Sequence, residues 1–250
     1  MKRFLPIIFV LLFTPWIDRL FAKPIAALLT VCACIFLYAL VMRVPNDSKK
    51  IYTAVLTALF VVLTVFQITT TKRQFLFEIS NDDNRYQQEK LDSYPPVKIP
   101  ISNKTLWIPA AHWFEGRSEY LAYYRIEENL FENLDPGNYF FAMAPRPRTG
   151  VDEFEKFLYI FLPFFVYGLY KLIRNNWEVV VLTTLPFLAL LSLVGNSNPL
   201  GAFTLLPIIA VAVAVGMKPL FQCKNRIYLY VLIVLTLLVY IQIIAYQSYV

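Results

Sequence analysis

Residues 51–70 read IYTAVLTALFVVLTVFQITT and contain no charged side chain. An α-helix needs about 20 mostly apolar residues to cross the hydrocarbon core of a bilayer. This segment therefore predicts a membrane-spanning helix, and the rest of the chain can be interpreted outward from it.

Similar apolar segments recur on both sides. Hydrophobic residues make up 58% of the 250 positions and charged residues only 16%, whereas a soluble domain carries about 25% charged residues. We predict an all-α membrane bundle of about seven transmembrane helices, with a small extracytoplasmic α+β domain inserted between helices 3 and 4. The predicted spans lie near residues 4–22, 25–43, 51–70, 157–173, 179–195, 201–217 and 227–247.

The predicted domains are residues 1–70 (transmembrane helices 1–3), 71–156 (the polar domain) and 157–250 (transmembrane helices 4–7). The first span could instead be a cleaved signal peptide. No small-residue cleavage site follows Leu20-Phe21-Ala22, so we favour a retained helix.

The distribution of charge predicts the orientation. Residues 71–156 hold 11 of the 23 Lys and Arg and 14 of the 17 Asp and Glu, which makes that segment acidic and the remainder basic. Cytoplasmic loops carry an excess of Lys and Arg. The short-loop cations expected inside are Lys2, Arg3, Arg43, Lys49, Lys50, Lys171, Arg174, Lys218, Lys224 and Arg226, against Arg19 and Lys23 outside. We predict a multi-pass plasma-membrane (cytoplasmic membrane) protein with a cytoplasmic N-terminus and with residues 71–156 and the C-terminus extracytoplasmic.

The polar domain has a mixed secondary-structure pattern and no cysteine. Ser80 followed by Asp83 predicts a helix start that continues to about Ser93. Residues 97–109 alternate in polarity and predict an edge strand or an extended loop. A second helix is predicted over 110–134, with a buried stripe of Tyr123, Ile126, Leu130 and Leu134. Asp135-Pro136-Gly137 predicts a turn after this helix. The run 139–143 is either a buried strand or a segment resting on the membrane.

Four residues of this domain are candidates for acid–base catalysis. Asp82 and Asp83 are adjacent carboxylates that could serve as a catalytic base or bind a divalent cation. The alternative is capping and dipole stabilisation in the first turn of a helix. His112, the single histidine, lies near Glu115 and could shuttle a proton. The alternative is that both face water at the start of an interfacial helix. One histidine without other soft ligands predicts no metal site.

Five further residues are candidates for substrate binding. Trp107 and Trp113 could stack on a sugar, and Arg117 closes the same stretch. Arg146 and Arg148 precede a predicted span, where a guanidinium can bind a lipid phosphate through paired hydrogen bonds. The alternative for the two arginines is ordinary anchoring in the headgroup layer.

The predicted spans are plain. Apart from Asp18 and Arg19 they hold no Asp, Glu, Lys, Arg or His at their centres, which argues against an ion-coupled transporter. Ala210, Ala212, Ala214 and Gly216 form two small-xxx-small pairs that predict close helix packing, within the chain or with a partner. The placement of the basic residues in short loops argues against nucleic acid as a partner.

Four short stretches carry a resemblance. Uncharacterised bacterial multi-span envelope membrane proteins have sequences similar to Asn138-Tyr139-Phe140-Phe141, Pro145-Arg146-Pro147-Arg148, Asp152-Glu153-Phe154-Glu155-Lys156-Phe157 and Leu162-Pro163-Phe164-Phe165. That resemblance implies a compartment and no activity. A looser similarity links the chain to membrane-embedded glycosyltransferases that use lipid-linked sugars. Those enzymes carry an acidic catalytic residue in the first outer loop, where this chain has only Asp18.

Two functions remain open from the sequence. The favoured one is a scaffold or subunit of a membrane complex, with the lipid bilayer and a membrane protein as partners. The alternative is a transferase that acts on a lipid-linked sugar or another lipid phosphate at the outer face of the membrane. Neither the cofactor nor the question of whether the chain is an enzyme is decided by the sequence.

Overall fold

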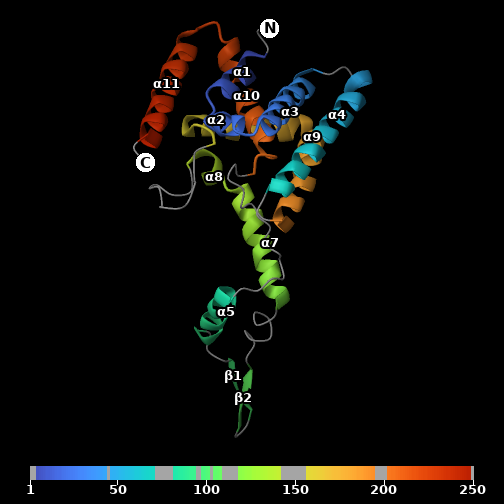
Figure 1. Ribbon diagram of the computed structural model, residues 1–250, viewed down its shortest axis with the longest axis vertical. Helices are drawn as coiled ribbons and strands as arrows, with labels where there is room; N and C mark the ends of the chain where they lie inside the picture. The colour runs from blue at the N-terminus through green and yellow to red at the C-terminus, as the bar shows by residue number, and fades with distance from the viewer. Residues whose placement is uncertain are drawn as a thin grey trace.

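The computed structural model describes residues 4–43, 46–70, 81–93, 97–101, 104–108, 118–141, 156–194 and 202–248 (Figure 1). Apolar helices form a bundle at one end of the molecule, and a polar arm extends from it. The bundle consists of α1 (Leu5–Leu12), α2 (Trp16–Phe21), α3 (Pro24–Arg43), α4 (Asn46–Thr70), η1 (Tyr159–Phe161), α9 (Leu162–Val194), α10 (Leu206–Gln222) and α11 (Ile227–Ser248). The arm consists of α5 (Asn81–Ser93), β1 (Val97–Ile101), β2 (Lys104–Ile108), α7 (Ser118–Leu134) and α8 (Gly137–Phe140).

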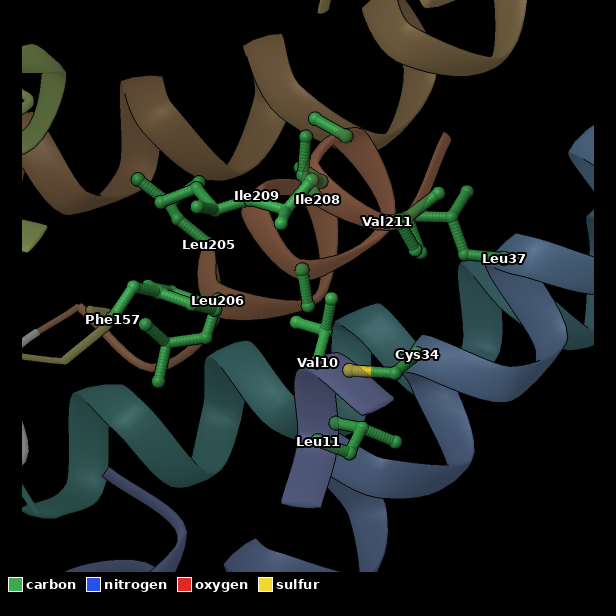
Figure 2. Close-up of a cluster of buried hydrophobic side chains, with 14 of the residues drawn as sticks. Val10, Leu11, Cys34, Leu37, Phe157, Leu205, Leu206, Ile208, Ile209 and Val211 are labelled. Carbon is green, nitrogen blue, oxygen red and sulfur yellow. The ribbon is translucent and has the colours of Figure 1, made fainter. Parts of the chain in front are cut away.

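Helix α10 lies at the centre of the bundle. Every residue from Leu206 to Met217 is buried, and α10 packs mainly against α9, α1 and α3. Figure 2 shows Val211 of α10 beside Leu37 of α3, and Val10 of α1 beside Cys34 of α3. A helix that is apolar on all sides belongs in a core, and this pattern accounts for the position of α10.

Helices α9 and α10 approach each other backbone to backbone. A Cβ atom on Gly168 would lie 1.8 Å from the carbonyl oxygen of Ala212, and one on Gly216 would lie 2.0 Å from the carbonyl oxygen of Phe164. The two contacts are four residues apart on each helix. Their order along α9 is the reverse of their order along α10, so the helices are antiparallel. The predicted small-residue pair Ala212 and Gly216 is therefore used inside the chain.

The prediction of seven spans is wrong. Three helices of the described residues are long and apolar enough to cross a membrane, at Pro24–Met42, Ile51–Thr70 and Tyr159–Val194. The helices Leu206–Gln222 and Ile227–Ile243 are apolar but shorter. The predicted spans at 25–43 and 51–70 correspond to α3 and α4.

Local features explain the overcount. The predicted span at 4–22 is split into α1 and α2 because proline disfavours helix at the residue before it, and Pro15 follows Thr14. The predicted spans at 157–173 and 179–195 are joined in one helix, α9, because the polar residues between them stay helical except at Asn176 (φ −142°, ψ 40°). Helix α10 begins only at Leu206, with a proline in its first turn.

The predicted α+β domain is also wrong. Within the described part of the chain, strands occur only in one antiparallel hairpin, in which Val97 pairs with Ile108 and Ile101 with Lys104. A two-stranded hairpin alone makes no β core. The rest of the arm is helical, and the helix predicted to run from Ser80 to Ser93 is confirmed as α5.

The outer surface of the bundle is strongly apolar. Side chains such as Leu28 of α3, Ile51 of α4, Leu185 of α9 and Leu238 of α11 are exposed, together with many others on the same helices. A soluble protein rarely exposes such extended apolar surface. With three helices of spanning length, this surface is that of a membrane-embedded protein.

Candidate functional site

The structure leaves the nine predicted site residues as predictions. His112, Trp113, Glu115, Arg117, Arg146 and Arg148 lie outside the described residues. Asp82 and Asp83 lie in the first turn of α5, where a helix dipole stabilises carboxylates. Trp107 lies on β2 opposite Lys98. The side chains of Asp82, Asp83 and Trp107 lie outside the described part of the structure.

A different polar cluster connects the arm to the bundle. We call it the junction and define it as Asn129, Asn133, Asn138, Tyr139, Lys156 and Ser192. Its members come from α7, α8, the segment just before η1, and the last turn of α9. The junction ties together elements that are far apart in the sequence.

A tight turn brings α8 back over the end of α7. The Asp135 carboxylate accepts a hydrogen bond from the Gly137 N–H (2.8 Å), and the Pro136 carbonyl accepts from the Tyr139 N–H (3.1 Å). Asp, Pro and Gly each favour turns, through side-chain acceptance, a fixed φ and conformational freedom. The sequence predicted this turn, and the structure confirms it.

The turn lets two side chains cap the end of α7. The last four carbonyls of an α-helix have no partner within the helix. The Tyr139 hydroxyl donates to the Asn133 carbonyl (2.8 Å), and the Asn138 amide donates to the Glu132 carbonyl. Helix α7 therefore ends on side chains from α8, and the direction of α7 is coupled to the position of α8.

Asparagines on the inner face of α7 fix it to the bundle. The Asn129 amide donates to the carbonyl of Ser192 in the last turn of α9 (3.1 Å), which satisfies one of the free carbonyls there. The Asn133 amide donates to the Asn129 carbonyl (2.7 Å). The other amide atom of Asn133, Oδ1, is buried without a partner. An unsatisfied buried acceptor costs about 1–3 kcal/mol, so the burial of this Asn133 oxygen lowers the free energy of unfolding.

Lys156 joins the start of the second apolar region to α8. Its ammonium donates to the Asn138 carbonyl (2.7 Å) and lies 5.8 Å from the centre of the Tyr139 ring. The N–H groups of Lys156 and Phe157 both donate to the Tyr139 carbonyl (3.1 and 2.8 Å). These four contacts hold residues 156 and 157 directly against α8.

An aromatic layer lies on the bundle side of the junction. The Phe140 ring packs on Phe157 (5.7 Å between centroids) and Phe165 (5.4 Å), and Trp16 packs on Phe157 (6.2 Å). Phe140 and Phe157 are fully buried. Aromatic pairs stabilise by about 0.5–1.5 kcal/mol beyond the area that they bury, so the layer anchors the junction on α2 and α9.

Burial raises the pKa of Tyr139 well above its usual value. Desolvation is the largest cause, and the charges of Glu132 and Asp135 raise the pKa further. The hydroxyl is therefore neutral at physiological pH and acts as a hydrogen-bond donor. In this cluster the lysine is bound to a carbonyl and the tyrosine is buried and protonated, an arrangement suited to holding helices and not to transferring protons.

A second buried polar contact lies inside the bundle. Gln67 of α4 is fully buried, and its Oε1 accepts from both the N–H and the hydroxyl of Thr204 (3.4 Å each). The Phe66 and Phe203 rings are adjacent, 6.3 Å apart. This contact fastens the turn before α10 to α4.

No family model, curated protein or solved structure matches this chain. Its likeness to multi-span envelope proteins therefore stays a prediction. The function is inferred from the geometry of the chain itself.

The buried face of α7 differs from the buried stripe that the sequence predicts. Ala122 and Asn133 are buried, Ile126 and Leu130 are half-buried, and Tyr123 and Leu134 are exposed. The predicted stripe is thus wrong at both ends, because the buried side of α7 takes in the asparagines. Two asparagines spaced four residues apart among apolar neighbours were the sequence signal for that side, but Ser192, the partner of Asn129, is 63 residues away.

Proposed function

We propose that this chain is a scaffold or subunit of a membrane complex, and that its apolar bundle holds α7 in a fixed position for a partner. The observation that carries the proposal is the junction: α7 is capped by α8 and bonded to α9, and α8 packs on an aromatic layer, yet large apolar side chains on the other face of α7 are exposed. Ordering a helix costs conformational entropy. A rigidly held helix with an exposed apolar face is what a binding subunit requires.

The packing of the small residues of α10 supports α7 as the binding surface. Ala212 and Gly216 pack against the backbone of Gly168 and Phe164 in the same chain. The small-residue face of α10 is therefore unavailable to a second protein, and a partner has to bind elsewhere. The exposed face of α7 is such a place.

We also propose that the arm lies on the extracytoplasmic side of the plasma membrane. Residues 43–50, between the apolar segments Pro24–Met42 and Ile51–Thr70, contain Arg43, Lys49 and Lys50 against one acidic residue, Asp47. By the bias of cations toward the cytoplasm, this end of α3 and α4 is inside, and α4 then leads residues 71–156 outside. The predicted cytoplasmic N-terminus and extracytoplasmic C-terminus stay predictions.

The test is to extract the protein gently from its own membranes and to identify bound proteins and lipids by native mass spectrometry. We expect a protein partner in fixed stoichiometry. A monomer without a partner would contradict the proposal. A retained prenyl-phosphate lipid that is lost in an Arg146→Ala, Arg148→Ala variant would replace it with the transferase prediction.

A further inference from the structure

The outward face of α7 carries a stripe of four aromatic side chains and one leucine. With 3.6 residues per turn, Tyr120, Tyr123, Tyr124, Phe131 and Leu134 fall within about 100° of the circumference. Tyr123, Phe131 and Leu134 are 62%, 60% and 52% exposed. From Tyr120 to Leu134 the stripe is about 21 Å long at 1.5 Å per residue, which is the contact length of two packed helices.

The stripe extends beyond the apolar bundle. Figure 1 shows α7 leading away from α3, α4 and α9, with only its C-terminal part beside α9. The bond from Asn129 to Ser192 marks that overlap. Tyr123 and Tyr124 precede it, on the half of α7 that continues toward α5.

Carboxylates accompany the stripe. Helix α7 contains Glu119, Glu127, Glu128 and Glu132 against Arg125. Glu127 falls within the aromatic arc and Glu128 beside it. The carboxylates disfavour two possible occupants of the stripe, the same face of a second copy and an anionic lipid surface. Both would place negative groups against the carboxylates.

The stripe already binds one cation within the chain. The ammonium of Lys90 on α5 lies 5.6 Å from the ring centre of Tyr120 and 5.9 Å from that of Tyr124. Aromatic faces attract ammonium and guanidinium groups. The two tyrosines thus show the preference of this surface for positive charge.

We propose that the outward face of α7 binds a helix of a partner protein whose apolar stripe is flanked by Lys or Arg. The inference rests on the proposed scaffold function and adds the site and the chemistry of the partner. The partner's apolar residues cover Tyr123, Phe131 and Leu134, and its cations lie near Glu127 and Glu128.

The experiment uses the full chain in nanodiscs of neutral phosphatidylcholine and two synthetic amphipathic peptides of about 18 residues. The peptides share one leucine stripe, flanked by lysine in one and by glutamate in the other. We expect the lysine peptide to bind at least about tenfold more tightly, and added salt to reduce that difference. Equal binding of the two peptides, or equal binding to empty nanodiscs, would overturn the inference.

Variants locate the binding. Exchanging Glu127→Lys and Glu128→Lys should reverse the preference between the peptides, whereas Asp92→Lys on the exposed surface of α5 should leave it unchanged. Phe131→Ser should weaken the binding of both peptides by about tenfold. Gln88→Ser on the exposed surface of α5 should weaken the binding of neither peptide. Unchanged binding in the Phe131→Ser variant, with an unfolding temperature like that of the parent, would assign the peptide site elsewhere.

Native complexes separate this inference from the proposed function. If a membrane complex persists in the Glu127→Lys, Glu128→Lys and Phe131→Ser variants, the site assigned to α7 is wrong and the scaffold function stands. If the parent chain has no protein partner at all, the scaffold function fails, and with it the inference.

Discussion

Gly168 and Ala212 meet where α9 crosses α10, so closely that a Cβ atom on Gly168 would come within 1.8 Å of the Ala212 carbonyl oxygen. The contact is with backbone, which cannot move aside as a side chain can. Of the described contacts, this crossing therefore sets the tightest limit on residue size in the bundle.

Gly168→Ala should destabilise the bundle by about 3 kcal/mol or more, because the methyl group forces α9 and α10 apart. Thermal unfolding in detergent or nanodiscs would measure the loss. Gly137→Ala is the matched control, since its Cβ would meet the Asp135 carboxylate at 3.0 Å, a side chain that can shift. Equal effects of the two substitutions would show that the crossing is looser than described.

Asn129→Ala should loosen α7 from the bundle. The substitution removes the bond to the Ser192 carbonyl, worth about 0.5–1.5 kcal/mol. Hydrogen exchange of the α7 amides should accelerate, while exchange in α10 stays slow. Asn84→Ala on the exposed surface of α5 is the control. Unaltered exchange in α7 would show that the other contacts of the junction hold the helix without this bond.

Alkaline pH should open the junction. In the opened state Tyr139 ionises near its ordinary pKa of about 10, whereas in the closed state burial raises its pKa well above that value. The open state therefore binds fewer protons above about pH 10, and the stability of the junction, complete below that pH, falls as the pH rises. Exchange of the α7 and α8 amides, corrected for the intrinsic rate, should increase between pH 9 and 11, values set by that pKa.

Tyr139→Phe separates this effect from other titrations. The variant loses the bond to the Asn133 carbonyl, at a cost of about 1 kcal/mol, but should lose most of the alkaline dependence as well. A variant that opens with the same pH profile as the parent would assign the dependence to another group.

Gln67 and Thr204 should be energetically coupled. Gln67→Leu deprives two buried donors of Thr204 of one acceptor, which should lower stability by about 1–3 kcal/mol. A double-mutant cycle with Thr204→Val should give a coupling of about 0.6 kcal/mol, the size measured for polar pairs within membranes. A coupling of zero would mean that Gln67 acts through other contacts.

Hydropathy predicted the helices that are continuous apolar runs, and it missed a helix break and a helix kink. Residues 25–43 and 51–70 are continuous apolar runs and form α3 and α4 as expected. The hydropathy of residues 4–22 gave no indication that the chain breaks around Thr14. Hydropathy equally predicted a loop near Asn176, where one helix continues through a kink.

The candidate site was less predictable than the fold. The Asp135-Pro136-Gly137 turn is local and was found from the sequence. Tyr139, in contrast, was interpreted as part of an apolar run, although its hydroxyl caps α7. Asn129 and Lys156 take their roles from Ser192 and Asn138, partners 63 and 18 residues away. Such pairs are set by packing, which no local pattern encodes.

The burial of α10 has a consequence for biosynthesis. Its neighbours α1, α3 and α9 all precede it in the chain, so they emerge from the ribosome first and must leave a vacancy the width of one helix. Until α10 fills that vacancy, the bare backbone at Gly168 faces lipid or a chaperone. The core of the bundle is therefore completed only after the helix that forms its centre has been synthesised.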